Sequence, residues 1–149
     1  MIKKAIMVLF LLVIVSTLLS FPLSLNCYSA PGKEVSELRT WCSKSAEEFF
    51  KNKWGKGIIE TKNDLTIINY MYHYNEKMNK CFVILVKMHS TKKEVISNTK
   101  ELWDVNKNEN HGNFSKYVKE EKPSACIVEN KRCYSEHAWD SLVRQYMEE

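Results

Sequence analysis

An apolar run near the start of the chain divides the sequence into two unlike parts. From Ala5 to Phe21 the apolar residues are interrupted only by serine and threonine, and two lysines precede the run. A stretch of this length is stable across a bilayer core while the lysines stay on the cytoplasmic side. Small residues follow at Ser29 and Ala30, as at the cleavage site of an export signal. We therefore expect residues 1–29 to be a signal peptide and residues 30–149 to be the folded part.

Two alternatives keep the N-terminal segment attached to a membrane. The apolar run is nearly long enough to serve as an uncleaved signal anchor, although Pro22 favours a break at its end. Cys27, just beyond the run, is a candidate for lipidation, although Ser24, Leu25 and Asn26 match the usual lipoprotein signal poorly. A lipidated Cys27 would convert a soluble domain into an anchored one. Contact with a membrane is expected only in these two cases.

Composition excludes a nucleic-acid-binding protein. The chain has 149 residues and a net charge of +4, and two of its lysines belong to the N-terminal segment. The other lysines are scattered among glutamates and aspartates along the chain, whereas nucleic-acid binding requires a clustered basic surface. Residues 30–149 contain no linker that would mark a second domain, and therefore we expect a single globular domain.

The cysteines predict a disulfide framework. The chain has five cysteines, and removal of Cys27 with the signal peptide leaves an even number: Cys42, Cys81, Cys126 and Cys133. Export places them in an oxidising compartment, where four cysteines allow three connectivities. We expect Cys126 to bond to Cys133 across a short hairpin and Cys42 to bond to Cys81. The alternative, a zinc site that includes His137, lacks the paired cysteine spacing of such sites.

Hydrophobic periodicity predicts an α+β fold. Apolar positions from Glu34 to about Trp54 recur at helical spacing with Cys42 on the buried stripe, and a capped amphipathic helix follows Ser135. Between them we expect an antiparallel sheet of four or five short strands, stapled by the disulfides. A hairpin is predicted at the centre of the sheet, with Asn75 opposite Lys80. The expected strands are 65–75, 81–89, about 99–106, about 113–119 and the small cysteine hairpin.

Three alternate tyrosines form a possible binding surface. Tyr70, Tyr72 and Tyr74 share one face of the predicted hairpin with Cys81. Such a row presents a flat amphipathic platform suited to a peptide or a glycan. The alternative is core packing, which we favour because a bond from Cys81 to Cys42 would place the first helix over the same face.

No catalytic or cofactor-binding pattern occurs in the sequence. The histidines show no metal-ligand spacing, each cysteine of the mature chain has a disulfide partner, and the glycines match no nucleotide-binding loop. Paired glutamates lie among lysines, as on a solvated surface. We therefore expect a protein that is not an enzyme, with no cofactor, no metal and no catalytic residue.

Three strings resemble those of small exported bacterial proteins of uncharacterised function. They are YNEKMNKCFVIL from Tyr74, ELWDVN from Glu101 and KRCYSEHAWDSLVRQYMEE from Lys131. The similarity lies mainly in residues 70–149. It implies export and a single domain, and it implies no activity.

Together these features predict an exported domain, periplasmic or extracellular, that binds a protein, a peptide or an envelope component. The alternative is a membrane-tethered accessory subunit, held by the uncleaved N-terminal helix or by a lipidated Cys27.

Overall fold

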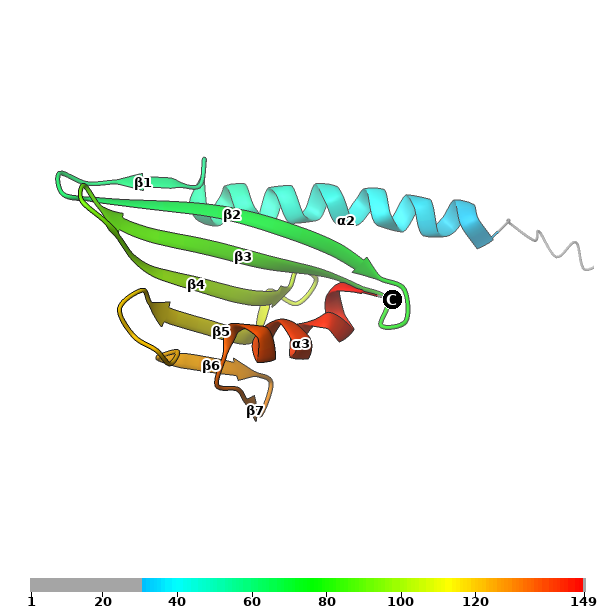
Figure 1. Cartoon of the computed structure of the whole chain (residues 1–149). Coiled ribbons are helices and arrows are strands. Elements are labelled where there is room, and N and C mark those ends of the chain that lie inside the picture. The colour runs from blue at the N-terminus through cyan, green and yellow to red at the C-terminus, as the bar shows by residue number, and fades with distance from the viewer. Residues whose placement is uncertain (1–30, 149) are drawn as a thin grey trace, which may run out of the picture. The chain divides into compact units, whose positions relative to one another are not determined.

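Seven antiparallel strands form the centre of the fold, in the order in which they follow one another along the chain (Figure 1). The computed structural model describes residues 31–148, so the predicted signal peptide and Cys27 lie outside the described residues. Helix α2 precedes the sheet and helix α3 follows it. The elements are α2 (Pro31–Trp54), β1 (Ile58–Glu60), β2 (Asp64–Asn75), β3 (Lys80–Thr91), β4 (Val95–Asp104), β5 (Glu109–Tyr117), β6 (Ala125–Val128), β7 (Lys131–Arg132) and α3 (Glu136–Met147).

The α+β class and the two terminal helices agree with the prediction, but the predicted count of four or five strands is too low. β1 has 3 residues, too few to show the alternation by which a strand is recognised. β7, with 2 residues, is the second strand of the predicted cysteine hairpin. Residues 109–112 are part of β5, although the sequence predicts a loop there. A turn with Asn108 at φ 54° makes this longer strand possible, because asparagine tolerates the left-handed region well.

The hairpin of β2 and β3 has the predicted register. Asn75 lies opposite Lys80, and the pairing continues without a shift to Asp64 and Thr91. The prediction of a central hairpin holds for β3, which is paired along its length on both sides. For β2 it holds only over residues 65–67, which pair with β1.

Helix α2 covers one face of β2 and β3. Ala46 and Phe50 pack with Ile68, Val83 and Leu85, and all five are buried. α2 ends where the chain turns back to the sheet at Gly57, which has a φ of 73° and leaves no room for a side chain. A Cβ atom at Gly57 would lie 2.4 Å from the Ile68 carbonyl oxygen, and therefore only glycine fits between the helix and the strand.

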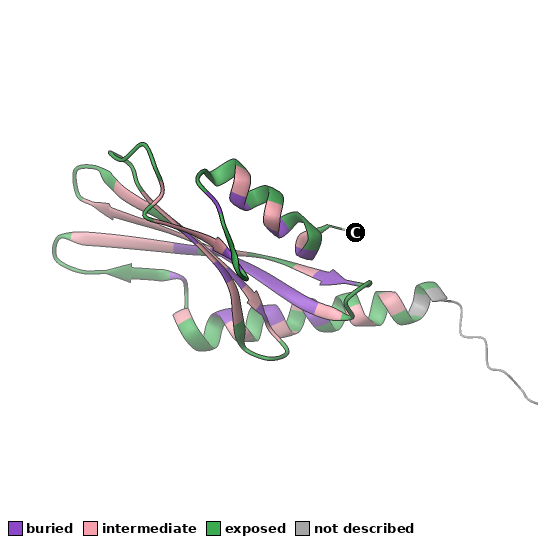
Figure 2. Cartoon of the chain, turned by 90° about the horizontal axis from the view of Figure 1, so that it is seen from below, coloured by how far each residue is buried: buried purple, intermediate pink, exposed green. Residues whose placement is uncertain are grey.

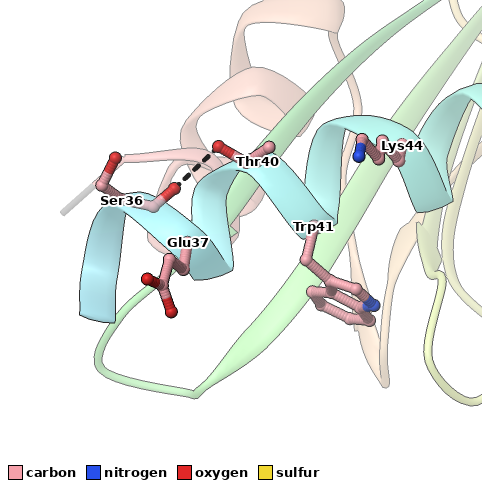
Figure 3. Close-up of a pocket in the computed structure, with 5 residues that line it drawn as sticks. All are labelled: Ser36, Glu37, Thr40, Trp41 and Lys44. Carbon is pink, nitrogen blue, oxygen red and sulfur yellow. Dashed lines mark hydrogen bonds between the residues drawn. The ribbon is translucent and has the colours of Figure 1, made fainter. Parts of the chain in front are cut away.

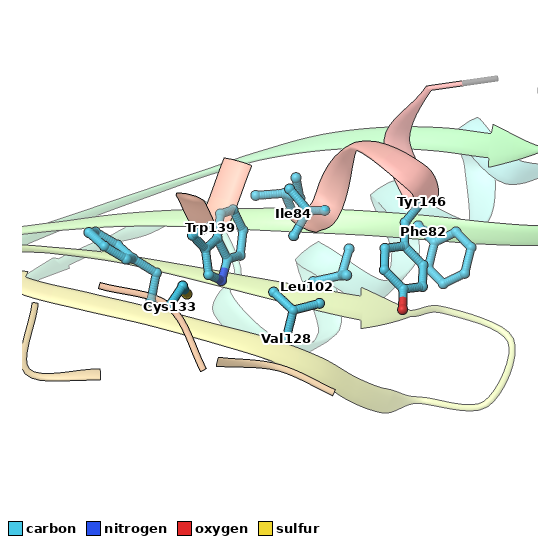
Figure 4. Packing of buried hydrophobic residues seen from close by; sticks show 9 residues of the cluster. Phe82, Ile84, Leu102, Val128, Cys133, Trp139 and Tyr146 are labelled. Atoms are coloured by element: carbon cyan, nitrogen blue, oxygen red, sulfur yellow. The ribbon is translucent and has the colours of Figure 1, made fainter. Parts of the chain in front are cut away.

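Helix α3 covers the opposite face. Trp139, Val143 and Tyr146 pack on side chains from β3 to β6 (Figure 4), and Figure 2 shows buried residues on the sides of both helices that face the sheet. Ser135 caps α3 as predicted, because its hydroxyl accepts a hydrogen bond from the Ala138 amide at 3.1 Å. Within residues 31–148, no helix combines the length and the apolar character needed to cross a bilayer.

Both predicted disulfides are present. Cys42 of α2 is bonded to Cys81 of β3, and Cys126 is bonded to Cys133 across the β6–β7 hairpin. Cys42 and Cys81 have no exposed surface, so the first bridge lies in the core between α2 and the sheet. The backbone amide of Cys133 donates to the carbonyl of Cys126 at 2.9 Å, which confirms that these two cysteines face each other.

Candidate functional site

The three predicted tyrosines share the α2 side of β2 but differ in environment. Tyr74 is 5% exposed and packs with the buried disulfide, and its hydroxyl donates to the Asn79 side chain at 2.5 Å. Tyr70 stacks on Phe50 with ring centres 4.6 Å apart. Tyr72 is 46% exposed. A ligand for this surface stays a prediction, and of the three side chains Tyr72 is the one most available to it.

The backbone of the same three residues faces the outer edge of the sheet. The Ile68 amide donates to the Gly57 carbonyl, and the Asp64 carbonyl accepts from the Thr61 amide. Even-numbered residues of β2 therefore point their amides and carbonyls outward, because strand residues alternate between the two sides. The amides and carbonyls of Tyr70, Tyr72 and Tyr74 consequently point away from β3.

Most of this outer edge lies beyond the reach of the short strand β1. β1 pairs with residues 65–67, and Gly57 extends the contact to Ile68. Within residues 31–148, neither a strand nor a hydrogen bond from another segment reaches the outward backbone groups from Asn69 to Asn75. We call residues 69–75 the open edge.

The open edge also lacks the residues that usually protect an edge strand. Natural edges carry lysine, other charges, proline or a bulge, which prevent pairing with another chain. Residues 69–75 read NYMYHYN, without a charged side chain or a proline, and the β2–β3 register shows no shift along them. The opposite edge of the same sheet, β7, consists of Lys131 and Arg132, both exposed.

A cluster of cations and aromatic rings joins the end of α2 to β3 and β4. The Lys53 ammonium lies 3.7 Å from the Trp103 ring centre and 4.4 Å from that of Phe49. The Trp103 indole donates to Glu101 at 3.0 Å, and Glu101 also pairs with Lys87 at 2.5 Å. Burial lowers the pKa of Lys53, although Glu101 opposes this effect. The rings of Phe49 and Trp103 are already in contact with Lys53 of the same chain. The cluster therefore stabilises the packing of α2 on the sheet.

The hollow on the outer side of α2 offers few groups for chemistry. It is lined by Ser36, Glu37, Thr40, Trp41 and Lys44, all from α2 (Figure 3). The Thr40 hydroxyl donates a hydrogen bond to the Ser36 carbonyl at 2.9 Å. Among the residues that the structure describes, the lining comes from this one helix, so the polar groups do not converge on one point.

The groove between α3 and the β6–β7 hairpin is also built from groups that hold the fold. The Ser135 hydroxyl caps α3, and the Ser141 hydroxyl donates to the His137 carbonyl at 2.8 Å. Tyr134 is 79% exposed at its rim. Across residues 31–148, histidine, cysteine and acidic side chains nowhere form a group of three or more that could hold a metal ion.

Comparison with known proteins gives no relative from which a role could be carried over. The chain matches no family model, and neither the curated proteins nor the solved structures contain a match to it.

Sequence reasoning identified the tyrosines by their side chains and missed the open edge that their backbone forms. The missing information is the length of β1. The signals that could have supplied it are Gly57, which ends the helical segment, and the polar pair Lys62 and Asn63, which turns the chain into β2. Together these two positions leave room for only a short edge strand.

Proposed function

We propose that this protein is an exported, non-enzymatic binding domain that takes up an extended segment of a partner protein as an additional strand beside β2. The observation that carries the proposal is the open edge, where the backbone groups of Tyr70, Tyr72 and Tyr74 point outward and no strand of residues 31–148 pairs with them. Main-chain hydrogen bonds supply affinity in this mode of recognition, and alternate side chains supply specificity. The two disulfides agree with a protein that works in an oxidising compartment.

The open edge is prepared for pairing before a ligand arrives. β2 is held in register by β3 along its whole length, and the Cys42–Cys81 bond ties β3 to α2. A bound segment therefore adds hydrogen bonds to a rigid template, and the ordering cost falls mainly on the segment itself. Each such hydrogen bond contributes about 0.5–1.5 kcal/mol net. Several in a row, with side-chain contacts, are enough for specific binding.

A second copy of the chain fits this edge poorly. α2 packs on both β2 and β3, with Phe50 against Tyr70 and Cys42 bonded to Cys81. Paired strands lie about 4.8 Å apart, so a copy related by two-fold symmetry would bring its own α2 to about 10 Å or less from the first. Helices pack at about 8–10 Å only where their side chains are fitted to each other, and this flank of α2 carries the charged residues Glu47 and Lys51. An extended segment without a helix avoids this conflict.

The decisive experiment blocks one outward amide. Peptides are selected from a random-sequence display library on the immobilised full-length chain, and their affinities are measured for two variants. Tyr72→Pro removes an amide that faces the open edge and leaves the β2–β3 hydrogen bonds in place. Tyr72→Thr is the matched control, because it loses the same ring and keeps the amide. We expect Tyr72→Pro to weaken binding at least tenfold, which corresponds to about 1.4 kcal/mol, and Tyr72→Thr to weaken it much less.

Amide hydrogen exchange supplies the second readout. In the free protein the amides of Tyr70, Tyr72 and Tyr74 should exchange faster than those of Asn69, Met71 and His73. A selected peptide should protect the first group. Equal affinity for Tyr72→Pro and Tyr72→Thr would refute strand addition. Protection that grows with protein concentration alone, together with a doubled mass, would show that the partner is a second copy.

A further inference from the structure

The protein's own backbone blocks one end of the open edge. The chain leaves α2 at Trp54 and enters the sheet at Gly57, whose amide donates to the Trp54 carbonyl at 2.9 Å. The Gly57 carbonyl accepts from the Ile68 amide at 2.7 Å, and β1 continues from there along the same edge (Figure 1). The position beside Ile68 is therefore taken, and a strand added along residues 69–75 cannot run past it in the plane of the sheet.

The two ends of the open edge consequently differ in access. At the blocked end, a Cβ atom on Gly57 would lie 2.7 Å from the Phe50 ring, so no space for a second chain remains between α2 and the strand. At the other end, residues 76–79 turn from Asn75 toward β3 and away from the outer edge, so the hairpin itself does not obstruct a bound strand. A strand at the open edge can continue past Asn75, but beside Asn69 it must stop or turn sharply out of the sheet.

The direction of a bound segment decides which of its termini lies at the blocked end. β1 runs antiparallel to β2, as β3 does on the other side, and antiparallel pairing is slightly more stable than parallel pairing. A segment that runs antiparallel to β2 enters beside Asn75 and ends beside Asn69, in line with β1 and in front of Gly57. Its C-terminal end is therefore the end that meets the block.

The charge at the blocked end favours a carboxylate. Residues 51–59 contain no aspartate or glutamate and three lysines: Lys51, Lys53 and Lys56. Lys51 pairs with Glu47 at 2.5 Å. Lys56, directly before Gly57, is exposed, and no acidic side chain of residues 31–148 pairs with it. A carboxylate placed here would be attracted to Lys56, whereas the N-terminal ammonium of a parallel segment would be repelled.

We infer that the segment bound at the open edge is the C-terminal end of a partner chain, which runs antiparallel to β2 and places its terminal carboxylate beside Gly57 and the neighbouring Lys56. A chain end needs no turn at the blocked position, because no further residues follow it. Asn69, at the last pairing position, is exposed and adds an amide that can donate a hydrogen bond. The inference rests on the proposed strand addition, and it adds which part of the partner is bound and in which direction.

Peptides that differ only at their ends test the inference. A peptide selected on the full-length chain is synthesised with a free C-terminal carboxylate, with a C-terminal amide, with two glycines added after its C-terminus, and with two glycines added before its N-terminus. We expect the C-terminal glycines to weaken binding at least about tenfold, because the peptide must withdraw from Gly57 and lose main-chain hydrogen bonds. The N-terminal glycines should change binding less than about twofold, since they extend past Asn75. The amide should bind about threefold more weakly than the free acid, as expected for the loss of an exposed ion pair.

A matched pair of lysine variants tests the role of the carboxylate. Lys56 and Lys62 are both exposed and lie at opposite ends of β1, so that only Lys56 borders the open edge. Lys56→Gln should weaken binding of the free acid about threefold and leave binding of the amide unchanged, whereas Lys62→Gln should affect neither. Circular dichroism confirms that both variants are folded.

Four results would overturn the inference and leave strand addition intact. They are equal binding with and without the C-terminal glycines, a larger loss from the N-terminal glycines, equal affinity of the amide and the free acid, and equal effects of Lys56→Gln and Lys62→Gln. Failure of strand addition itself appears separately, as equal affinity of Tyr72→Pro and Tyr72→Thr.

Discussion

Removing each disulfide in turn should destabilise the protein by clearly different amounts. The Cys42–Cys81 bridge spans 39 residues of sequence, and the Cys126–Cys133 bridge spans 7. In the chain-entropy model, closing the longer loop raises the free energy of the unfolded chain by about 4 kcal/mol, and closing the shorter one raises it by about 2.4 kcal/mol. Replacing both cysteines of a pair by alanine should therefore cost about 1.5 kcal/mol more for the first bridge than for the second.

Packing in the folded state acts in the same direction. Cys42 and Cys81 are fully buried beside Tyr74, so alanine leaves a void at both positions. Cys133 is 7% exposed and Cys126 is half-buried in the small hairpin. The difference of about 1.5 kcal/mol between the stability losses of the two variants is therefore a lower bound.

Urea unfolding of the full chain measures this difference. With a slope of about 1.5 kcal/mol per M of urea, the urea concentration at half unfolding should fall by roughly 2.7 M in the variant without Cys42–Cys81. It should fall by roughly 1.6 M in the variant without Cys126–Cys133. Wild-type protein unfolded in a reducing agent is the control, because it should be no more stable than either double variant. An equal loss for both variants, or a larger loss for the short bridge, would refute the argument from loop length.

Three further perturbations have definite expected outcomes. Gly57→Ala should lower the free energy of unfolding by about 2–4 kcal/mol, because its methyl group would meet the Ile68 carbonyl oxygen; an unchanged melting temperature would show that this turn moves freely. Trp139→Ala should cost about 3–5 kcal/mol in urea unfolding, since Trp139 is fully buried, and a cost below about 1 kcal/mol would contradict this. Burial opposes a charged Lys100, but hydrogen bonds to two α3 carboxylates raise its pKa above 10.5. Its stabilising effect is thus complete below pH 10.5 and is lost as pH rises through the raised pKa; Lys100→Met should therefore flatten the fall in melting temperature at alkaline pH, and parallel curves would contradict this.

Local chemistry is the part of this fold that could be predicted from the sequence. Ser135 caps α3, and Asn75 pairs with Lys80, because both features depend on residues a few positions apart. The pairing of Cys42 with Cys81 spans a longer distance, yet it followed from the buried stripe of one helix and the strand pattern of one hairpin. Each of these predictions needed only the periodicity of a single element.

The open edge could not be predicted in this way, because an edge is a property of neighbours. Large side chains on both sides of residues 69–75 indicate a central strand, and both sides of this sheet are indeed occupied by helices. What decides the position of β2 is that β1 begins only at Ile58, opposite Ile67, where the chain enters it from Gly57. No alternation within residues 69–75 carries that information.

The strand order of the sheet has a consequence for how the chain assembles as it is made. Each strand pairs with the strand that precedes it in the sequence, so a chain that emerges from its N-terminus can extend the sheet one strand at a time, without leaving a gap for a later segment. Local pairing of this kind favours rapid folding. The exception is α3, which follows all seven strands in the sequence and covers Ile84, Leu102 and Phe114. Until α3 is in place, the apolar side chains on one side of a nearly complete sheet stay exposed, and a partly folded chain with such a surface is prone to aggregation.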